Sequence, residues 1–357
     1  MTDKQDKKKG DGGARDMPWE PRVWNGMGVK AWFSLLARNR FRVSPTRVPM
    51  ALLNSGICFI NSALAWQQQL FFGRKIAECR LADDPIFILG HWRTGTTWLH
   101  ELMVLDERHA FPTTYECLTA SHFLYSARMT RWWLWMLMPR KRPMDNVRIS
   151  LDTPQEDELA MCALGAHSPY LSWAFPNRPP QDQEYLDLRD LSPAALADWK
   201  AKLDWFLRAV QVKNPGQRIV LKSPTHTFRV PVLMDMFPNA RFVYLVRDPY
   251  VVFPSMIKTW KRLHLYHGAQ VPKHIGLEEY VFKNFEHLHR VFEEDRKLIP
   301  PERLCVMRYE DLVSAPVAQV KHIYEELDLG RFDEVKPRLE KFVDGLSDYV
   351  ANRHNLP

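Results

Sequence analysis

Four short apolar segments, each followed at once by a polar loop, constrain the fold of this 357-residue chain more than any other feature. Their length and β-branched content are typical of buried parallel strands. Helical patterns separate them, so the chain is predicted to be an α/β protein with a parallel sheet flanked by helices. The loops after the strands would then converge on one edge of the sheet, where such folds bind ligands. The predicted strands are residues 85–89, 218–222, 241–246 and 304–309.

The part of the chain before the first strand has a different character. Residues 1–16 are charged and lack the apolar core of a signal peptide, which predicts a disordered tail and a cytoplasmic protein. Residues 17–82 are predicted to form a helical N-terminal extension, in which residues 48–72 are apolar but interrupted by Asn, Ser and Gln. We expect an amphipathic helix or helix pair there and no membrane span. The α/β domain covers residues 83–357, with helices predicted at 96–105, 155–164, 193–212, 227–236, 250–263, 277–298 and 317–327.

Composition narrows the class of protein. The chain has 49 Lys and Arg against 42 Asp and Glu, a net charge of +7 that favours an anionic partner only mildly. The basic residues form local clusters, so we expect no nucleic-acid partner. No two of the five cysteines form a C-x-x-C pair, which predicts reduced thiols and no metal site of that kind.

The loop after the first predicted strand has the form of an anion-binding turn. It reads GHWRTGTT, with Gly90 and Gly95 five residues apart and a helix following. Such a loop points backbone N–H groups and the helix N-terminus at an anion. The glycine spacing equals that of a Walker A loop, but Thr96 stands where the lysine belongs, and the positive charge comes from Arg93. This arrangement suits an anionic group that is transferred without metal.

A second candidate anion site follows the third predicted strand. Arg247 ends that strand, and Ser255 lies eight residues later, about two turns into the next helix. A guanidinium group together with a hydroxyl is suited to binding a second phosphate.

Together the two sites resemble those of sulfotransferases that use 3′-phosphoadenosine 5′-phosphosulfate. In that family a basic residue followed by x-Gly-Thr-Thr holds the 5′-phosphosulfate, and an Arg with a Ser eight residues later holds the 3′-phosphate. Arg247 and Ser255 match the second motif in residue type and spacing. The matching residues of the first are Arg93, Thr94, Gly95, Thr96, Thr97 and Trp98.

The resemblance extends to two further segments. Tyr309 lies in a Tyr-Glu-Asp segment like the one whose tyrosine approaches the adenine in the family. Asn352 and Arg353 resemble a C-terminal segment that closes over the cofactor in some bacterial members. The resemblance thus implies a P-loop-like sulfotransferase fold with a nucleotide cofactor and a hydroxyl acceptor. A Mg²⁺-dependent P-loop kinase-like phosphotransferase is the alternative.

In-line sulfuryl transfer needs positive charge beside the leaving oxygen and a base for the acceptor hydroxyl. Arg93 and Lys222, which ends the second predicted strand, are the candidates for the charge. Glu116 is the preferred base because family members with a glutamate base place it at a similar distance after the loop. His226 is the second candidate for the base. The acidic run at residues 155–158 is expected to be a solvated helix start, with contact to the acceptor as the alternative.

The acceptor is expected to be a lipid-like alcohol or a carbohydrate. The segment from Trp132 to Met138, WWLWMLM, has arginines and a lysine on both sides. It is too short to span a membrane, and we interpret it as a lid or core helix. Contact with a membrane surface and a pocket for an apolar substrate are the alternatives, because basic residues around tryptophans are typical of interfacial helices.

Overall fold

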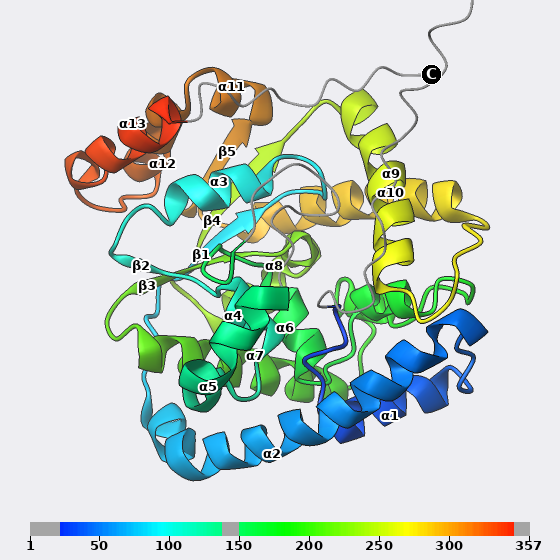
Figure 1. Cartoon of the computed structure of the whole chain (residues 1–357). Helices are drawn as coiled ribbons and strands as arrows, with labels where there is room; N and C mark the ends of the chain where they lie inside the picture. The colour runs from blue at the N-terminus through cyan, green and yellow to red at the C-terminus, as the bar shows by residue number, and fades with distance from the viewer. Residues whose placement is uncertain (1–21, 138–149, 346–357) are drawn as a thin grey trace, which may run out of the picture.

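The computed structural model describes residues 22–137 and 150–345, and within them a five-stranded sheet forms the centre of the molecule (Figure 1). All strands are parallel, in the order β2-β3-β1-β4-β5. Four of them confirm the predicted strands. The two-residue strand β2 was not predicted, since so short a segment has no periodicity. The strands are β1 (Ile86–Leu89), β2 (His109–Ala110), β3 (Arg218–Lys222), β4 (Arg241–Val246) and β5 (Leu304–Arg308).

The register of the sheet brings the ends of the long strands together. Ile88 of β1 pairs with Lys222 at the end of β3, and Leu89 pairs with Tyr244 of β4. Val246, at the end of β4, pairs with Arg308 at the end of β5. The loops that follow these four strands therefore leave the sheet at one edge, as the sequence predicted.

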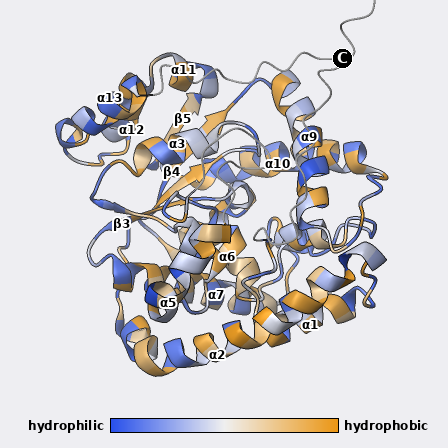
Figure 2. Ribbon diagram, in the orientation of Figure 1, coloured by the Kyte–Doolittle hydropathy of each residue, from blue (hydrophilic) through white to orange (hydrophobic). Residues whose placement is uncertain are grey.

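Both faces of the sheet are buried by helices. Because side chains alternate along a strand, Phe87 and Leu89 face one core while Ile86 and Ile88 face another. The first core includes residues of α7 (Pro193–Lys213) and α8 (Val230–Met236). The second includes residues of α3 (Thr96–Met103), α11 (Tyr309–Ser314), α12 (Pro316–Glu326) and α13 (Lys336–Asp344). In Figure 2 the strands of the sheet lie at the centre of the molecule and carry mostly hydrophobic residues.

The predicted helices are present, with small differences at their ends. The helix predicted at 227–236 is shorter in the structure, where α8 follows a 3-10 turn at Pro224–Phe228. The helix predicted at 277–298 consists of α10 (Leu277–Asp295) and a final 3-10 turn at Arg296–Leu298. Pro224 and Pro231 explain the first difference, since proline favours the first turn of a helix. Helices α6 (Asp157–Ala163) and α9 (Pro249–His267) also match predicted helices, whereas the short α4 (Thr114–Leu118) was not predicted.

The N-terminal region is helical, as expected, and packs on the α/β domain. It consists of α1 (Val29–Arg38) and α2 (Val48–Glu78), a single 31-residue helix where one helix or a pair was predicted. The Trp24 and Trp32 rings stack with centroids 5.0 Å apart. They share a third core with Trp173 and other residues of the α/β domain. The predicted tail, residues 1–16, lies outside the described residues.

The tryptophan-rich segment belongs to α5 (Phe123–Leu137). This helix contacts α2, where the Phe71 and Tyr125 rings stack 5.4 Å apart and the backbone N–H of Leu124 donates to Oε1 of Gln68. Met138 and the basic residues after it lie outside the described residues.

Candidate active site

The loop between β1 and α3 adopts a backbone shape that glycine makes accessible. Gly90, Arg93 and Gly95 all have positive φ angles, and Gly95 forms the N-cap of α3. A Cβ atom at Gly95 would lie 2.1 Å from Cδ2 of Tyr309, so no larger residue fits there. Thr94 stabilises the turn by donating from Oγ1 to the carbonyl oxygen of His91 at 2.7 Å. The loop is therefore a cradle at the N-terminus of a helix, which suits an anion.

The second anion motif packs directly on this loop. Nε of Arg93 donates to Oγ of Ser255 in α9 at 3.0 Å, and Nη1 of Arg247 donates to the carbonyl oxygen of Arg93 at 3.0 Å. The guanidinium of Arg247 also lies 4.1 Å from the centroid of the Tyr309 ring. Residues more than 150 positions apart in sequence thus form one cluster at the edge of the sheet.

The charge in this cluster favours a strongly anionic ligand. Burial lowers the pKa of Arg247, the Tyr309 hydroxyl opposes that shift, and the charge of Arg93 adds to it. Two like charges and the positive end of α3 are therefore concentrated in one place. The donor groups and the glycine cradle fit a nucleotide that carries phosphate at two positions.

The other predicted cofactor residues occupy different places. Thr96 and Thr97 begin α3, directly beyond the glycine cradle, and the side chain of Thr96 is buried. Trp98 stacks on Phe342 of α13 with ring centroids 5.8 Å apart, so its ring is part of the packing between these helices. Asn352 and Arg353 lie outside the described residues.

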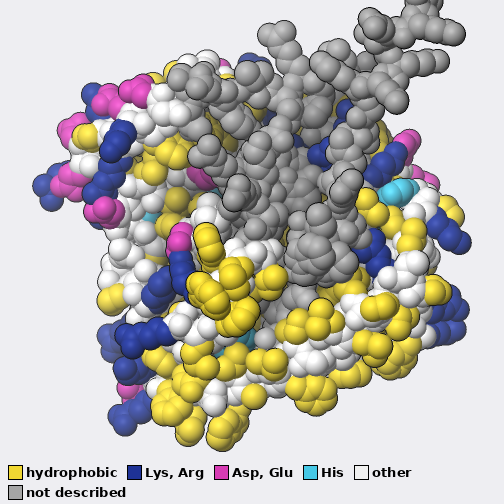
Figure 3. Space-filling model, viewed as in Figure 1, with side chains coloured by type: hydrophobic (Ala, Val, Ile, Leu, Met, Phe, Trp, Pro, Cys, Tyr) yellow, Lys and Arg dark blue, Asp and Glu magenta, His cyan; other side chains and the backbone are white. Residues whose placement is uncertain are grey.

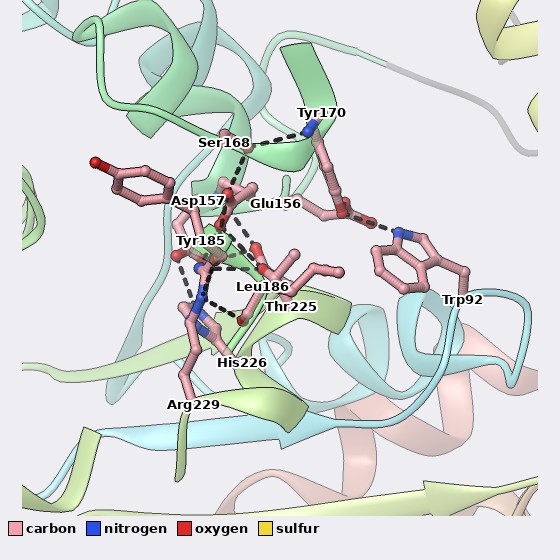
Figure 4. Close-up of polar contacts among 12 residues, drawn as sticks. Trp92, Glu156, Asp157, Ser168, Tyr170, Tyr185, Leu186, Thr225, His226 and Arg229 are labelled. Carbon is pink, nitrogen blue, oxygen red and sulfur yellow. Dashed lines mark hydrogen bonds and ion pairs between the residues drawn. The ribbon is translucent and has the colours of Figure 1, made fainter. Parts of the chain in front are cut away.

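Lys222 is held at the end of β3 by a carboxylate that the sequence had not assigned to it. Its Nζ donates to Oε1 of Glu156 at 2.6 Å, and the lysine side chain is 2% exposed. The hydroxyl of Tyr170 donates to Oε2 of Glu156 at 2.6 Å and accepts from Nε1 of Trp92 at 3.0 Å (Figure 4). Trp92 lies in the anion loop, so this chain of polar contacts connects Lys222 to that loop.

The two acidic residues after Glu156 are also paired with basic side chains. Oδ2 of Asp157 lies 2.7 Å from Nε2 of His226, and Oε2 of Glu158 accepts from Nη1 of Arg229 at 2.6 Å (Figure 4). All four of these side chains are 0% exposed. Burial raises the pKa of Asp157, but the charge and hydrogen bond of His226 outweigh that effect and hold it below its usual range. The expectation of a solvated acidic helix start is therefore wrong.

The two predicted bases have structural contacts in this conformation. Glu116 completes a capping box at the start of α4, where its Oε2 accepts from the N–H of Thr113 at 2.8 Å and its Oε1 from Nζ of Lys213 at 2.6 Å. Its side chain is 1% exposed. His226 has no exposed surface, so an acceptor hydroxyl cannot reach it here.

Sequence reasoning missed the roles of Glu156 and Tyr170. A signal for Glu156 was present, because three consecutive acids at 156–158 face three basic residues that recur every three to four positions. Those basic residues are Lys222, His226 and Arg229. Tyr170 lies in a 3-10 segment (Pro169–Ala174) with no motif, and only the fold places it beside Glu156.

A parallel sheet with the Arg93 loop and Arg247 at its carboxyl edge, and no Walker lysine, is a P-loop-like arrangement for an anionic group. Comparison with known proteins agrees, since the model of a sulfotransferase family matches residues 85–334. The chain belongs to the sulfotransferase family. Enzymes named omega-hydroxy-beta-dihydromenaquinone-9 sulfotransferase Stf3, from Mycobacterium bovis and Mycobacterium tuberculosis, are 45% identical over 341 residues. That alignment covers 95% of this chain and 87% of each relative.

Solved structures show the same fold. Sulfotransferase STF9 from Mycobacterium avium superposes with a TM-score of 0.67 at 19% identity, covering 93% of this chain and 86% of that one. Sulfotransferase STF1 from Mycobacterium tuberculosis H37Rv gives a TM-score of 0.63 at 17% identity, covering 88% and 86%. The family decides between the two activities that the sequence left open, in favour of sulfuryl transfer.

The buried pair of Glu158 and Arg229 leads to a prediction about stability. We expect Glu158→Gln to lower the free energy of unfolding by about 3–5 kcal/mol, because it leaves the Arg229 charge buried without a counter-charge. Urea unfolding measures this. Glu325→Gln is the matched control, since it removes an exposed partner of Lys321 and should cost at most about 1 kcal/mol. Equal losses in the two variants would show that the carbonyl groups of Tyr185 and Leu186 suffice for Arg229.

Proposed function

We propose that this sulfotransferase takes its sulfuryl group from 3′-phosphoadenosine 5′-phosphosulfate and transfers it, without metal, to the hydroxyl of a lipid alcohol. The observation that carries the proposal is the contact between the two anion motifs, in which Arg93 bonds Ser255 and Arg247 bonds the backbone of Arg93. A site with two separate anion-binding groups is what a nucleotide phosphorylated at both 3′ and 5′ positions requires.

The residues of the cluster divide between the two ends of this donor. The glycine cradle, Arg93 and the start of α3 would hold the 5′ end, and Arg247 with Ser255 would hold the 3′-phosphate. Tyr309, which packs against both Gly95 and Arg247, is placed to contact the adenine. When bound, the donor supplies a sulfuryl group already activated for transfer.

Lys222 and Glu156 provide the remaining chemistry. Lys222 and Arg93 carry the positive charge that stabilises the oxygen on which negative charge develops. We assign Glu156 as the base that takes the proton of the acceptor hydroxyl. Both carboxylates accept hydrogen bonds at each oxygen, but the Glu156 side chain is 18% exposed and the Glu116 side chain is 1% exposed. A base must come within hydrogen-bond reach of its proton, which favours the more accessible carboxylate.

The lipid-like acceptor is favoured over a carbohydrate by two observations. The relatives that are 45% identical over 95% of this chain are named for a hydroxylated dihydromenaquinone, a lipid alcohol. The chain also exposes three tryptophans on α5, a surface suited to contact with an apolar molecule; they are Trp132, Trp133 and Trp135.

Replacing Arg247 tests the nucleotide assignment. Arg247→Ala should weaken binding of 3′,5′-bisphosphoadenosine by about 10- to 150-fold, since a charged hydrogen bond contributes ~1.5–3 kcal/mol. Binding of adenosine 5′-monophosphate, which lacks the 3′-phosphate, should change little. Calorimetric titration of both nucleotides, with EDTA present, makes the comparison. If the variant loses the same factor for both nucleotides, Arg247 does not read the 3′-phosphate.

A pair of isosteric variants tests the base. We expect Glu156→Gln to lower kcat by about 10²- to 10⁴-fold with unchanged affinity for 3′,5′-bisphosphoadenosine. Glu116→Gln should instead lower the melting temperature and keep the turnover of the folded fraction, because it weakens a helix cap and an ion pair. Steady-state kinetics and thermal unfolding of both variants separate these roles. The reverse result would return the base assignment to Glu116.

The acceptor class is tested by direct transfer. With the donor and EDTA present, turnover is expected with a long-chain isoprenoid alcohol in detergent and not with a disaccharide. Mass spectrometry of the product, which gains 80 Da on sulfation, is the measurement. Turnover with the disaccharide alone would replace the lipid acceptor by a carbohydrate. Turnover that requires added Mg²⁺ would contradict transfer without metal.

A further inference from the structure

The outer face of α2 is apolar along most of its length. From Val48 to Phe71 every exposed residue except Gln69 is apolar or glycine. Large apolar side chains on this face are 40–67% exposed, which is unusual because a surface helix of a globular protein normally turns polar residues to water. They are Val48, Leu52, Leu53, Phe59, Ile60, Trp66, Leu70 and Phe71.

The inner face of the same helix carries its polar residues. Asn54, Asn61 and Gln68 recur every seven positions and are buried against the rest of the protein. Asn54 accepts from Nδ2 of Asn25 at 2.9 Å, and Nδ2 of Asn61 donates to the carbonyl oxygen of Met27 at 3.0 Å. Gln68 accepts from the N–H of Leu124. The polarity of α2 is therefore inverted, with amides inside and apolar groups outside.

Helix α5 extends this apolar surface. Its Trp132, Trp133 and Trp135 are 59–66% exposed, and Met129 and Met136 are exposed beside them. Figure 3 shows apolar side chains gathered over α2 and α5 on the face toward the viewer. We call the exposed apolar residues of these two helices the α2–α5 face.

Basic residues predominate around the α2–α5 face, although Arg74 pairs with Glu78 at the end of α2 and Arg131 of α5 pairs with Asp152. Residues 21–77 contain eight Lys and Arg and no Asp or Glu. The whole chain has a net charge of +7, so this segment carries +8 and the other residues together carry −1. Exposed basic residues lie before and after the apolar stretch of α2 and on α5, namely Arg40, Arg42, Arg74, Lys75 and Arg128.

We propose that the α2–α5 face docks the protein onto the surface of a membrane containing anionic phospholipids. Tryptophans and aliphatic groups bordered by basic residues are the composition of helices that lie in the membrane interface. A second copy of the chain would bring two segments of charge +8 together, which repel each other. The inference goes beyond the proposed acceptor and does not depend on it, since docking is measured without turnover.

The helix is expected to lie on the membrane rather than cross it. Among the described residues, Pro45–Glu78 is the helical stretch long and apolar enough to cross by length and composition. Crossing would pull the Asn54, Asn61 and Gln68 amides away from their partners and leave them unpaired in hydrocarbon, which is costly.

Cosedimentation of the full-length protein with sucrose-loaded vesicles tests the proposal. We expect binding to vesicles of 70% phosphatidylcholine and 30% phosphatidylglycerol, at least tenfold weaker binding to phosphatidylcholine alone, and release by 1 M NaCl. Phe59→Ser with Trp66→Ser on α2, or Trp133→Ser with Trp135→Ser on α5, should each reduce binding at least tenfold. The control pair is Leu298→Ser with Val313→Ser, which removes apolar groups of similar exposure outside these helices and should leave binding unchanged.

Each variant is first shown to keep the wild-type melting temperature and affinity for 3′,5′-bisphosphoadenosine, so that lost binding does not reflect unfolding. Absent binding by the wild type, or equal loss in the control pair, would overturn the proposal. Protein that stays with the vesicles in 1 M NaCl and alkaline carbonate would show that α2 inserts across the bilayer. A dimer in light scattering that the α2 variant converts to a monomer would make the face a subunit interface instead.

Discussion

Three consecutive acidic residues at the start of α6 neutralise three basic side chains from β3 and the turn after it. This contact fixes the position of the side chains at the carboxyl edge of the sheet. Glu156, Asp157 and Glu158 meet Lys222, His226 and Arg229, respectively. Two of the pairs are completely buried, where an unpaired charge would be strongly destabilising. Neither segment can therefore move without the other, and Lys222 is fixed at the sheet edge by the same contact.

The anion loop presents the opposite situation, since like charges are brought together there. The side chain of Arg247 donates a hydrogen bond to the backbone carbonyl of Arg93, which holds the two residues close together. The side chain of Arg93 in turn donates to the hydroxyl of Ser255. Such an arrangement is unfavourable alone and becomes favourable when an anion is bound. The fold thus places Lys222, paired with Glu156, near two arginines of like charge. Trp92 and Tyr170 join the two through hydrogen bonds.

The helices with the exposed apolar surface contact helices that lie near the site. Helix α5 contacts both α2 and α4. Helix α4, which contains Glu116, contacts α6, where the acidic residues begin, and the chain passes from α4 into α5. The apolar surface that we assign to membrane contact is therefore connected to the elements that position Lys222 and Glu156.

The sequence by itself determined the parallel sheet, its helices and the anion-binding motifs. These are local patterns: Gly90 and Gly95 allow the turn whichever residues surround it, and apolar runs such as 241–246 need only two covered faces. The contact of Arg93 with Ser255 was not predicted, since the resemblance to a family indicated only that the two motifs bind the two ends of one cofactor. The partners of the charged groups depended on the tertiary structure. In the sequence Glu116 was the preferred base and His226 the second candidate, with Glu156 in neither role, and only packing shows that Glu156 is the most exposed of the three. The orientation of α2 also depended on the tertiary structure. Its buried amides face the rest of the protein because Asn25, Met27 and Leu124 provide their hydrogen-bond partners on that side.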